Sequence, residues 1–143
     1  MRSVSRGIKT LFALAVGMMT FVVMTGTAHA ASASVSRTGV NAYASWNWNG
    51  RSTIDGINFR VTDTACDDND VYVRLRVYLT SRPDGVDTTK HYDSNGCNNG
   101  TVSSTGLPLR YTVDVTGIRV IGCVDDAGSD TCVRSGFLDN PNV

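Results

Sequence analysis

The sequence contains no glutamate, and it has little lysine or histidine after its first thirty residues. All thirteen acidic residues are Asp, while Lys90 and His91 are the only lysine and histidine after residue 30. Without Glu the chain lacks the bidentate ligand that closes an EF-hand loop. A single histidine and the absence of a Gly-x-Ser-x-Gly sequence give little support for a serine-hydrolase triad. We therefore expect a protein that is not an enzyme.

The sequence has only one long apolar run, and this run lies at the start of the chain. Three basic residues precede an apolar stretch over residues 11–24, and small residues follow up to Ala30. This stretch is shorter than the roughly 20 apolar residues that span a bilayer. The pattern is typical of a secretory signal peptide over residues 1–30, cleaved after Ala30. We expect a secreted, extracellular product that has no membrane contact after cleavage.

Basic residues do not dominate the expected product. After residue 30 the chain has ten basic and thirteen acidic residues, so its formal charge is about −3. Nucleic-acid binding requires a basic surface, and docking on anionic lipid requires one too, so neither partner is expected. The length fits one domain. We expect a flexible arm over residues 31–38, a single β domain over residues 39–143, and a monomer.

No helical period appears after residue 30, and apolar residues alternate with polar ones instead. Alternation with a period of two is typical of strands that have one buried face. In the clearest run, residues 71–79, every odd position is aliphatic and the even positions are Tyr72, Arg74, Arg76 and Tyr78. The pattern predicts a strand with an apolar core face and a polar outer face.

Further alternating runs occur between frequent turn signals. Trp46 and Trp48 occupy even positions, as do the apolar residues at 40, 42 and 44, so both tryptophans are expected in the core. Turn dipeptides such as Asn49-Gly50 separate about seven or eight short strands. This organisation predicts an all-β fold, a single antiparallel β-sandwich with a small β-barrel as the alternative. The other strand candidates are residues 40–48, 57–61, 111–115 and 118–120.

Four cysteines, an even number, are expected to form two disulfides in an exported chain. Three pairings are possible, and we favour Cys66–Cys97 with Cys123–Cys132. A loop of eight residues between Cys123 and Cys132 suits a bridge that clamps a hairpin. Zinc is the weaker alternative, because no two cysteines have the close spacing of a zinc site.

Two loops are rich in Asp. The first contains Asp67, Asp68 and Asp70 beside Cys66, and the second lies between Cys123 and Cys132. Carboxylate oxygens are ligands for Ca²⁺, so Asp67, Asp68 and Asp70 are candidate metal ligands. The competing and preferred interpretation is a solvated loop whose Asp and Asn side chains cap their own turns. We therefore expect no cofactor, with Ca²⁺ as the alternative.

The outer face of the strand over residues 71–79 is the candidate ligand-binding surface. Tyr72, Arg74, Arg76 and Tyr78 would form an aromatic and basic stripe on which a sugar ring could stack. The competing interpretation is an ordinary sheet exterior. The stripe predicts a non-catalytic module that binds extracellular or cell-envelope polysaccharide.

An alternative function is protein interaction, for example inhibition of a secreted hydrolase or surface assembly. The loop over residues 124–131 would then be the segment presented to the partner, because a disulfide-closed loop loses little entropy on binding. A flat strip of surface side chains would favour a glycan, and a protruding bridged loop would favour a secreted protein.

The segment from Cys66 to Arg74 and the segment from Gly117 to Cys132 together resemble a known group of proteins. Both place a cysteine loop rich in Asp next to an alternating strand. They are similar to small secreted actinobacterial proteins that have four cysteines and no assigned activity. The resemblance implies export, a β fold and a bridge between Cys123 and Cys132, and it implies no site residues.

Overall fold

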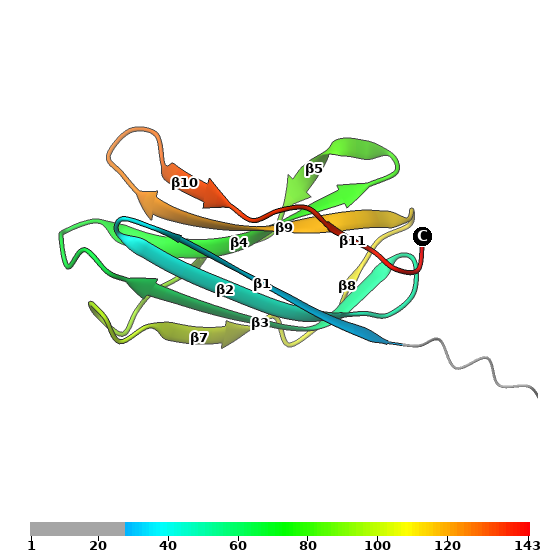
Figure 1. The fold of residues 1–143 in the computed structure, drawn as a ribbon, viewed down its shortest axis with the longest axis horizontal. Coiled ribbons are helices and arrows are strands. Elements are labelled where there is room, and N and C mark those ends of the chain that lie inside the picture. Colours follow the sequence, from blue (N-terminus) through cyan, green and yellow to red (C-terminus); the bar gives the residue numbers. More distant parts are fainter. Residues whose placement is uncertain (1–27) are drawn as a thin grey trace, which may run out of the picture.

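The computed structural model describes residues 28–143, so most of the predicted signal peptide lies outside the described residues. This part of the chain contains strands and no helix, and accordingly no helix long and apolar enough to cross a membrane. The strands form two antiparallel sheets that face each other, which confirms the predicted all-β sandwich (Figure 1).

The first sheet has the order β1-β2-β3-β7, with β8 pairing beside β7 on β3. Its strands are β1 (His29–Arg37), β2 (Val40–Trp48), β3 (Thr53–Asp63), β7 (Thr101–Ser104) and β8 (Leu109–Arg110).

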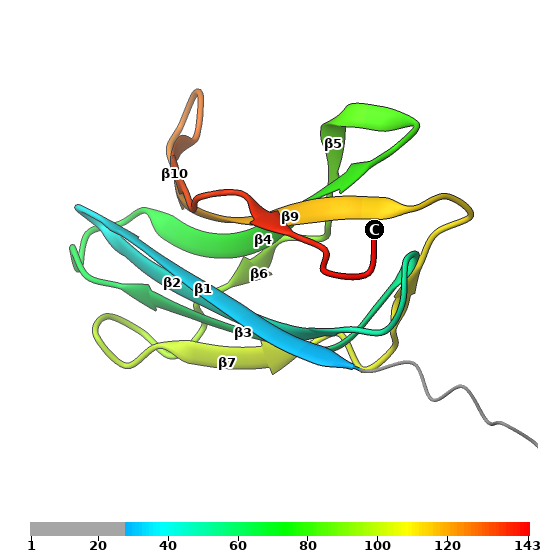
Figure 2. The ribbon, with the colours of Figure 1, turned by 45° about the vertical axis from the view of Figure 1, so that its right-hand side comes forward.

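The second sheet has the order β10-β9-β4-β5, with β11 pairing on β9 and β6 pairing on β4. The β9–β10 and β4–β5 hairpins project from it on the side away from the first sheet (Figure 2). Its strands are β4 (Asp70–Leu79), β5 (Arg82–Asp87), β6 (His91–Tyr92), β9 (Val115–Asp125), β10 (Thr131–Arg134) and β11 (Leu138–Asp139).

The core lies between the two sheets and follows the predicted alternation. All five odd positions of β4 are buried, and so are the inward positions of β9 that face them. Trp46 and Trp48 are 1% and 2% exposed and meet edge to face, with ring centroids 5.8 Å apart. The prediction that both tryptophans are core residues is confirmed.

The β1 strand corrects the expectation of a flexible arm over residues 31–38. Residues 29–37 pair with β2 along their whole length. Val35 is buried, and Ala31 and Ala33 pack against the core, while the serines between them face outward. The alternation is present in the sequence, but Ala and Ser differ little in hydrophobicity, so it gives a weak signal.

The expected strand over residues 111–115 is the second correction. Only Val115 belongs to a strand, because residues 111–114 cross from the first sheet to the second. The backbone N–H of Tyr111 donates to Ser52 (2.9 Å), and that of Val115 donates to Arg51 (2.8 Å). These bonds to the turn after β2 replace the ladder that a strand would form.

The two disulfides connect the pairs that the sequence analysis favours. Cys123 and Cys132 are directly opposite each other on β9 and β10, with Cα atoms 4.1 Å apart. Cys66 and Cys97 join the loop before β4 to the loop before β7. The predicted pairing is confirmed.

The C-terminal segment is attached through a buried amide. Asn140 is 4% exposed, and its Nδ2 donates to the carbonyls of Val115 (2.9 Å), Gly50 (3.3 Å) and Arg51 (3.3 Å). The side chain thus joins the chain end to the crossing between the sheets.

Replacing Asn140 by Ala should lower the free energy of unfolding by roughly 1–3 kcal/mol, because buried carbonyls lose their donor. Urea denaturation measures the change. Asn58→Ala is the matched control, since the exposed Asn58 Nδ2 makes one bond to the Gly56 carbonyl (2.9 Å). Equal effects of the two substitutions would contradict this role of Asn140.

Candidate functional site

The four residues of the predicted stripe all point outward from β4, but they do not form an exposed platform. Tyr72 has no exposed surface, which corrects the expectation that it faces solvent. It lies in a cross-strand row between Tyr92 of β6 and Cys123 of β9, and Cys132 of β10 follows. Because the outward residues of β9 here are apolar, Tyr72 packs with them and with the disulfide.

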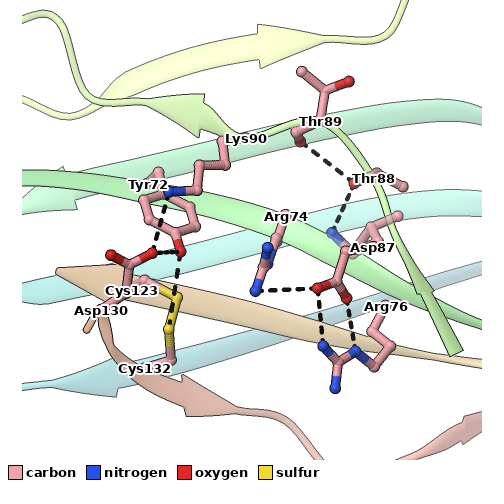
Figure 3. Close-up of polar contacts among 11 residues, drawn as sticks. Tyr72, Arg74, Arg76, Asp87, Thr88, Thr89, Lys90, Cys123, Asp130 and Cys132 are labelled. Carbon is pink, nitrogen blue, oxygen red and sulfur yellow. Dashed lines mark hydrogen bonds and ion pairs between the residues drawn. A yellow bond between two sulfur atoms is a disulfide. The ribbon is translucent and has the colours of Figure 1, made fainter. Parts of the chain in front are cut away.

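The hydroxyl of Tyr72 belongs to a charged cluster at the base of the β9–β10 hairpin (Figure 3). It donates to Asp130 (2.5 Å), and Lys90 Nζ lies 3.1 Å from the same carboxylate and 4.1 Å from the centre of the Tyr72 ring. Lys90 Nζ also lies 3.5 Å from Asp125, to which the Tyr92 hydroxyl donates (2.8 Å). The cluster connects β4, β6 and the hairpin.

Lys90 is held as a cation and Asp130 as an anion near neutral pH. Burial opposes the charged form of Lys90, but hydrogen bonds with Asp130 and Tyr92 outweigh it and raise the pKa of Lys90. Hydrogen bonds from Tyr72 and Lys90 lower the pKa of Asp130. A group that acts as a general acid or base titrates near the working pH. Lys90 and Asp130 titrate away from neutral pH, so they are suited to holding the hairpin as a fixed ion pair.

Arg74 and Arg76 share one carboxylate of β5. Arg76 binds Asp87 through two atoms, with Nε 2.6 Å and Nη2 2.8 Å from its oxygens, and Arg74 Nη2 lies 3.1 Å away (Figure 3). The hydrogen bonds from Arg76 lower the pKa of Asp87 against the effect of burial. Tyr78 meets Phe137 edge to face at 5.1 Å. No flat aromatic surface remains on this strand.

The candidate calcium ligands Asp67, Asp68 and Asp70 line one hollow of about 360 Å³ beside the Cys66–Cys97 bridge. Asp67 Oδ1 accepts the backbone N–H of Asn69 (3.0 Å), as expected for a residue that caps its own turn. Within residues 28–143, no three His, Cys or Asp side chains are arranged so that they could hold a metal ion.

His91 lies where β6 closes one edge of the sandwich. Its ring stacks on Phe59 of β3 with centroids 4.1 Å apart, and its Nδ1 is 3.1 Å from the hydroxyl of Ser103. Burial lowers the pKa of His91 below 6.5. The imidazole is therefore a packed side chain that joins the sheets.

A hollow of about 760 Å³ crosses the outer face of the first sheet, at a place that was not predicted from the sequence. Its centre is a cross-strand row in which Ser34, Tyr43 and Arg60 are direct neighbours on β1, β2 and β3. Tyr43 is 40% exposed. The sequence does contain a signal for this surface. The odd positions of residues 41–49 are polar, and Tyr43 is the one aromatic residue among them. We call this surface the Tyr43 groove.

The side chains around the Tyr43 groove are short and uncharged except for Arg60. No carboxylate lines it, so the surface offers hydroxyl and amide groups around one aromatic ring. A ligand here would meet many hydrogen-bonding groups and one positive charge. The remaining lining residues of the groove are Val35, Ser36, Asn41, Ala42, Thr62, Thr64 and Asn98.

Comparisons with known proteins give no further indication of function. No family model matches the sequence, and searches of curated proteins and of solved structures find no significant match.

The low pKa of His91 makes stability depend on pH. Above about pH 6.5 the imidazole is neutral in both states, so this contribution to stability is fully present. As the pH falls below 6.5, the unfolded chain binds the proton more readily, and the free energy of unfolding decreases until the pKa of the folded state is passed. Urea denaturation between about pH 7.5 and pH 5 measures this loss.

His91→Gln should reduce the dependence of the free energy of unfolding on pH between about pH 7.5 and pH 5, since Gln does not titrate. Asp87, Asp93 and Asp130 have pKa values below 3.8, so they contribute at lower pH in both proteins. If the free energy of unfolding changes equally with pH in the parent and the variant, His91 is not the responsible group.

Proposed function

We propose that the exported product is a non-catalytic module that binds extracellular or cell-envelope polysaccharide, and that the sugar occupies the Tyr43 groove. The observation that carries the proposal is the half-exposed ring of Tyr43 between Ser34 and Arg60. An aromatic ring presents a flat apolar face, and the groups around it supply the few placed hydrogen bonds that orient a ligand.

The setting of the groove supports a pyranose polymer as the ligand. The groove extends over three paired strands of the first sheet, so its floor is rigid before any ligand binds. A preformed surface loses little conformational entropy on binding. Two disulfides indicate an oxidising environment, in which exported proteins and polysaccharides meet. Secretion through the predicted leader is part of the proposal.

Tyr43→Ala should weaken binding to an insoluble polysaccharide by about tenfold, which corresponds to ~1.4 kcal/mol and to the loss of one aromatic contact. Co-sedimentation with cellulose, chitin and xylan measures it. Tyr92→Ala is the matched control, because Tyr92 is 39% exposed on the second sheet, against 40% for Tyr43.

The parent protein and Tyr92→Ala should sediment with at least one polymer, and Tyr43→Ala should remain in the supernatant. If the parent sediments with none of the three, or if Tyr43→Ala sediments equally well, the groove does not bind these polymers and the proposal is rejected.

A second candidate function is protein interaction through the β9–β10 hairpin. The hairpin projects from the second sheet, residues 127–129 at its tip are exposed, and Asp130 and the Cys123–Cys132 bridge fix its base (Figure 2). If the tip is the contact, capture of a partner from culture medium should fail with Ser129→Arg and persist with Tyr43→Ala. The reverse pattern would exclude the hairpin.

A further inference from the structure

Four arginines stand together on the outer face of the second sheet, opposite to the Tyr43 groove. Arg74 and Arg76 project from β4, Arg119 from β9 and Arg134 from β10. Arg76 and Arg119 are direct cross-strand partners, and Ile121 lies between Arg74 and Arg134 in the next row. Neighbouring strands are about 4.8 Å apart and alternate residues along a strand about 6.8 Å, so the four stems stand within roughly 12 Å. We call this surface the arginine patch.

The arginine patch has an excess of positive charge that the protein itself does not neutralise. Among residues 28–143, Asp87 is the one carboxylate that forms ion pairs with it; Arg74 and Arg76 share this carboxylate, and Arg134 also interacts with it electrostatically. Within the part of the chain that the structure describes, Arg119 and Arg134 form no ion pair. Four positive charges thus face one negative charge, on a product whose overall formal charge is about −3.

Two guanidinium groups of the patch each have one nitrogen, Nε, that lacks a hydrogen-bond partner. The Nε atoms of Arg74 and Arg119 are buried and have no partner within residues 28–143. Arg119 uses one Nη1 donor on the Ser135 carbonyl (3.2 Å), and its guanidinium lies 5.9 Å from the centre of the Phe137 ring. Buried donors without acceptors cost free energy, and like charges directly opposite in a sheet are destabilising.

We infer that the arginine patch is a binding site for a sulfate or phosphate group carried by an acidic polysaccharide. A tetrahedral oxyanion offers several acceptors to guanidinium groups, which bind such anions through two parallel hydrogen bonds. One oxyanion bound through the outer guanidinium nitrogens would offset the excess charge. The rest of the product has six basic and twelve acidic residues, so a long nucleic acid would be repelled beyond the patch.

The arginine patch is independent of the Tyr43 groove, since the two surfaces lie on opposite sheets (Figure 1). Titration of the folded protein with sodium sulfate, followed by the NMR signals of the arginine Nε–H groups, tests the site directly. Sodium chloride at the same ionic strength corrects for screening. We expect saturable shifts of the Arg74 and Arg119 signals with sulfate alone.

Arg119→Gln should weaken sulfate binding by about tenfold, the size of effect expected for one lost charged hydrogen bond. Arg110→Gln, which removes an exposed arginine of β8, should leave it unchanged. Asp87→Asn should strengthen binding, because it removes the competing carboxylate from Arg74 and Arg76. A purely structural role of the arginines would not give this gain. Near-ultraviolet circular dichroism confirms that each variant folds.

A second set of titrations, with a polymer, distinguishes binding of the free ion from binding of a polysaccharide. Dextran sulfate should bind more tightly per sulfate group than sodium sulfate, and unmodified dextran should not displace it. Tyr43→Ala should not change either result, so failure of the groove and failure of the patch can be told apart. The inference is overturned if sulfate and chloride give the same shifts, if Arg119→Gln binds like the parent, or if dextran sulfate binds no better than the free ion.

Discussion

The antiparallel pairing of β4 with β9 is the constraint on which the rest of the structure depends. It runs from Asp70 opposite Asp125 to Leu79 opposite Val115. The inner positions of both strands pack against the first sheet. The outer positions carry the arginine patch and the row in which Tyr72 packs against the Cys123–Cys132 bridge. A shift of one residue would exchange the two faces of a strand and bury arginines in place of aliphatic side chains. The register of this pair therefore sets both the core and the chemistry of the outer surface.

The sequence predicts those strands in which odd and even positions differ strongly in hydrophobicity. In β4 the contrast is between aliphatic residues and Tyr or Arg, so the strand and its buried face can be identified without a structure. In β1 the contrast is between Ala and Ser, and pairing with β2 decides the outcome. Residues 111–114 alternate well, yet their hydrogen bonds to the turn after β2 take them across the sandwich. Alternation reports which residues can be buried, and it does not report where the chain must change sheets.

The candidate sites depend on register between strands, which alternation within one strand cannot supply. Arg74 and Arg76 can be placed outward from the sequence, but the burial of Tyr72 follows from Cys123 beside it. The Tyr43 groove likewise combines Ser34, Tyr43 and Arg60 from three strands. The Tyr43 groove, with Arg60 as its one charged lining residue, and the basic arginine patch thus offer different chemistry within a single small domain.

The two disulfides differ in how a reductant can reach them. Thiol–disulfide exchange requires a thiolate to approach one sulfur directly. Cys66 lies in an exposed loop, whereas Cys123 has no exposed surface and is covered by β10 and Tyr72. The loop bridge is therefore more open to attack in the folded protein than the hairpin bridge, of which only the half-buried Cys132 is accessible. In a mildly reducing environment the protein would pass through a species with one bridge left, in which the hairpin remains closed.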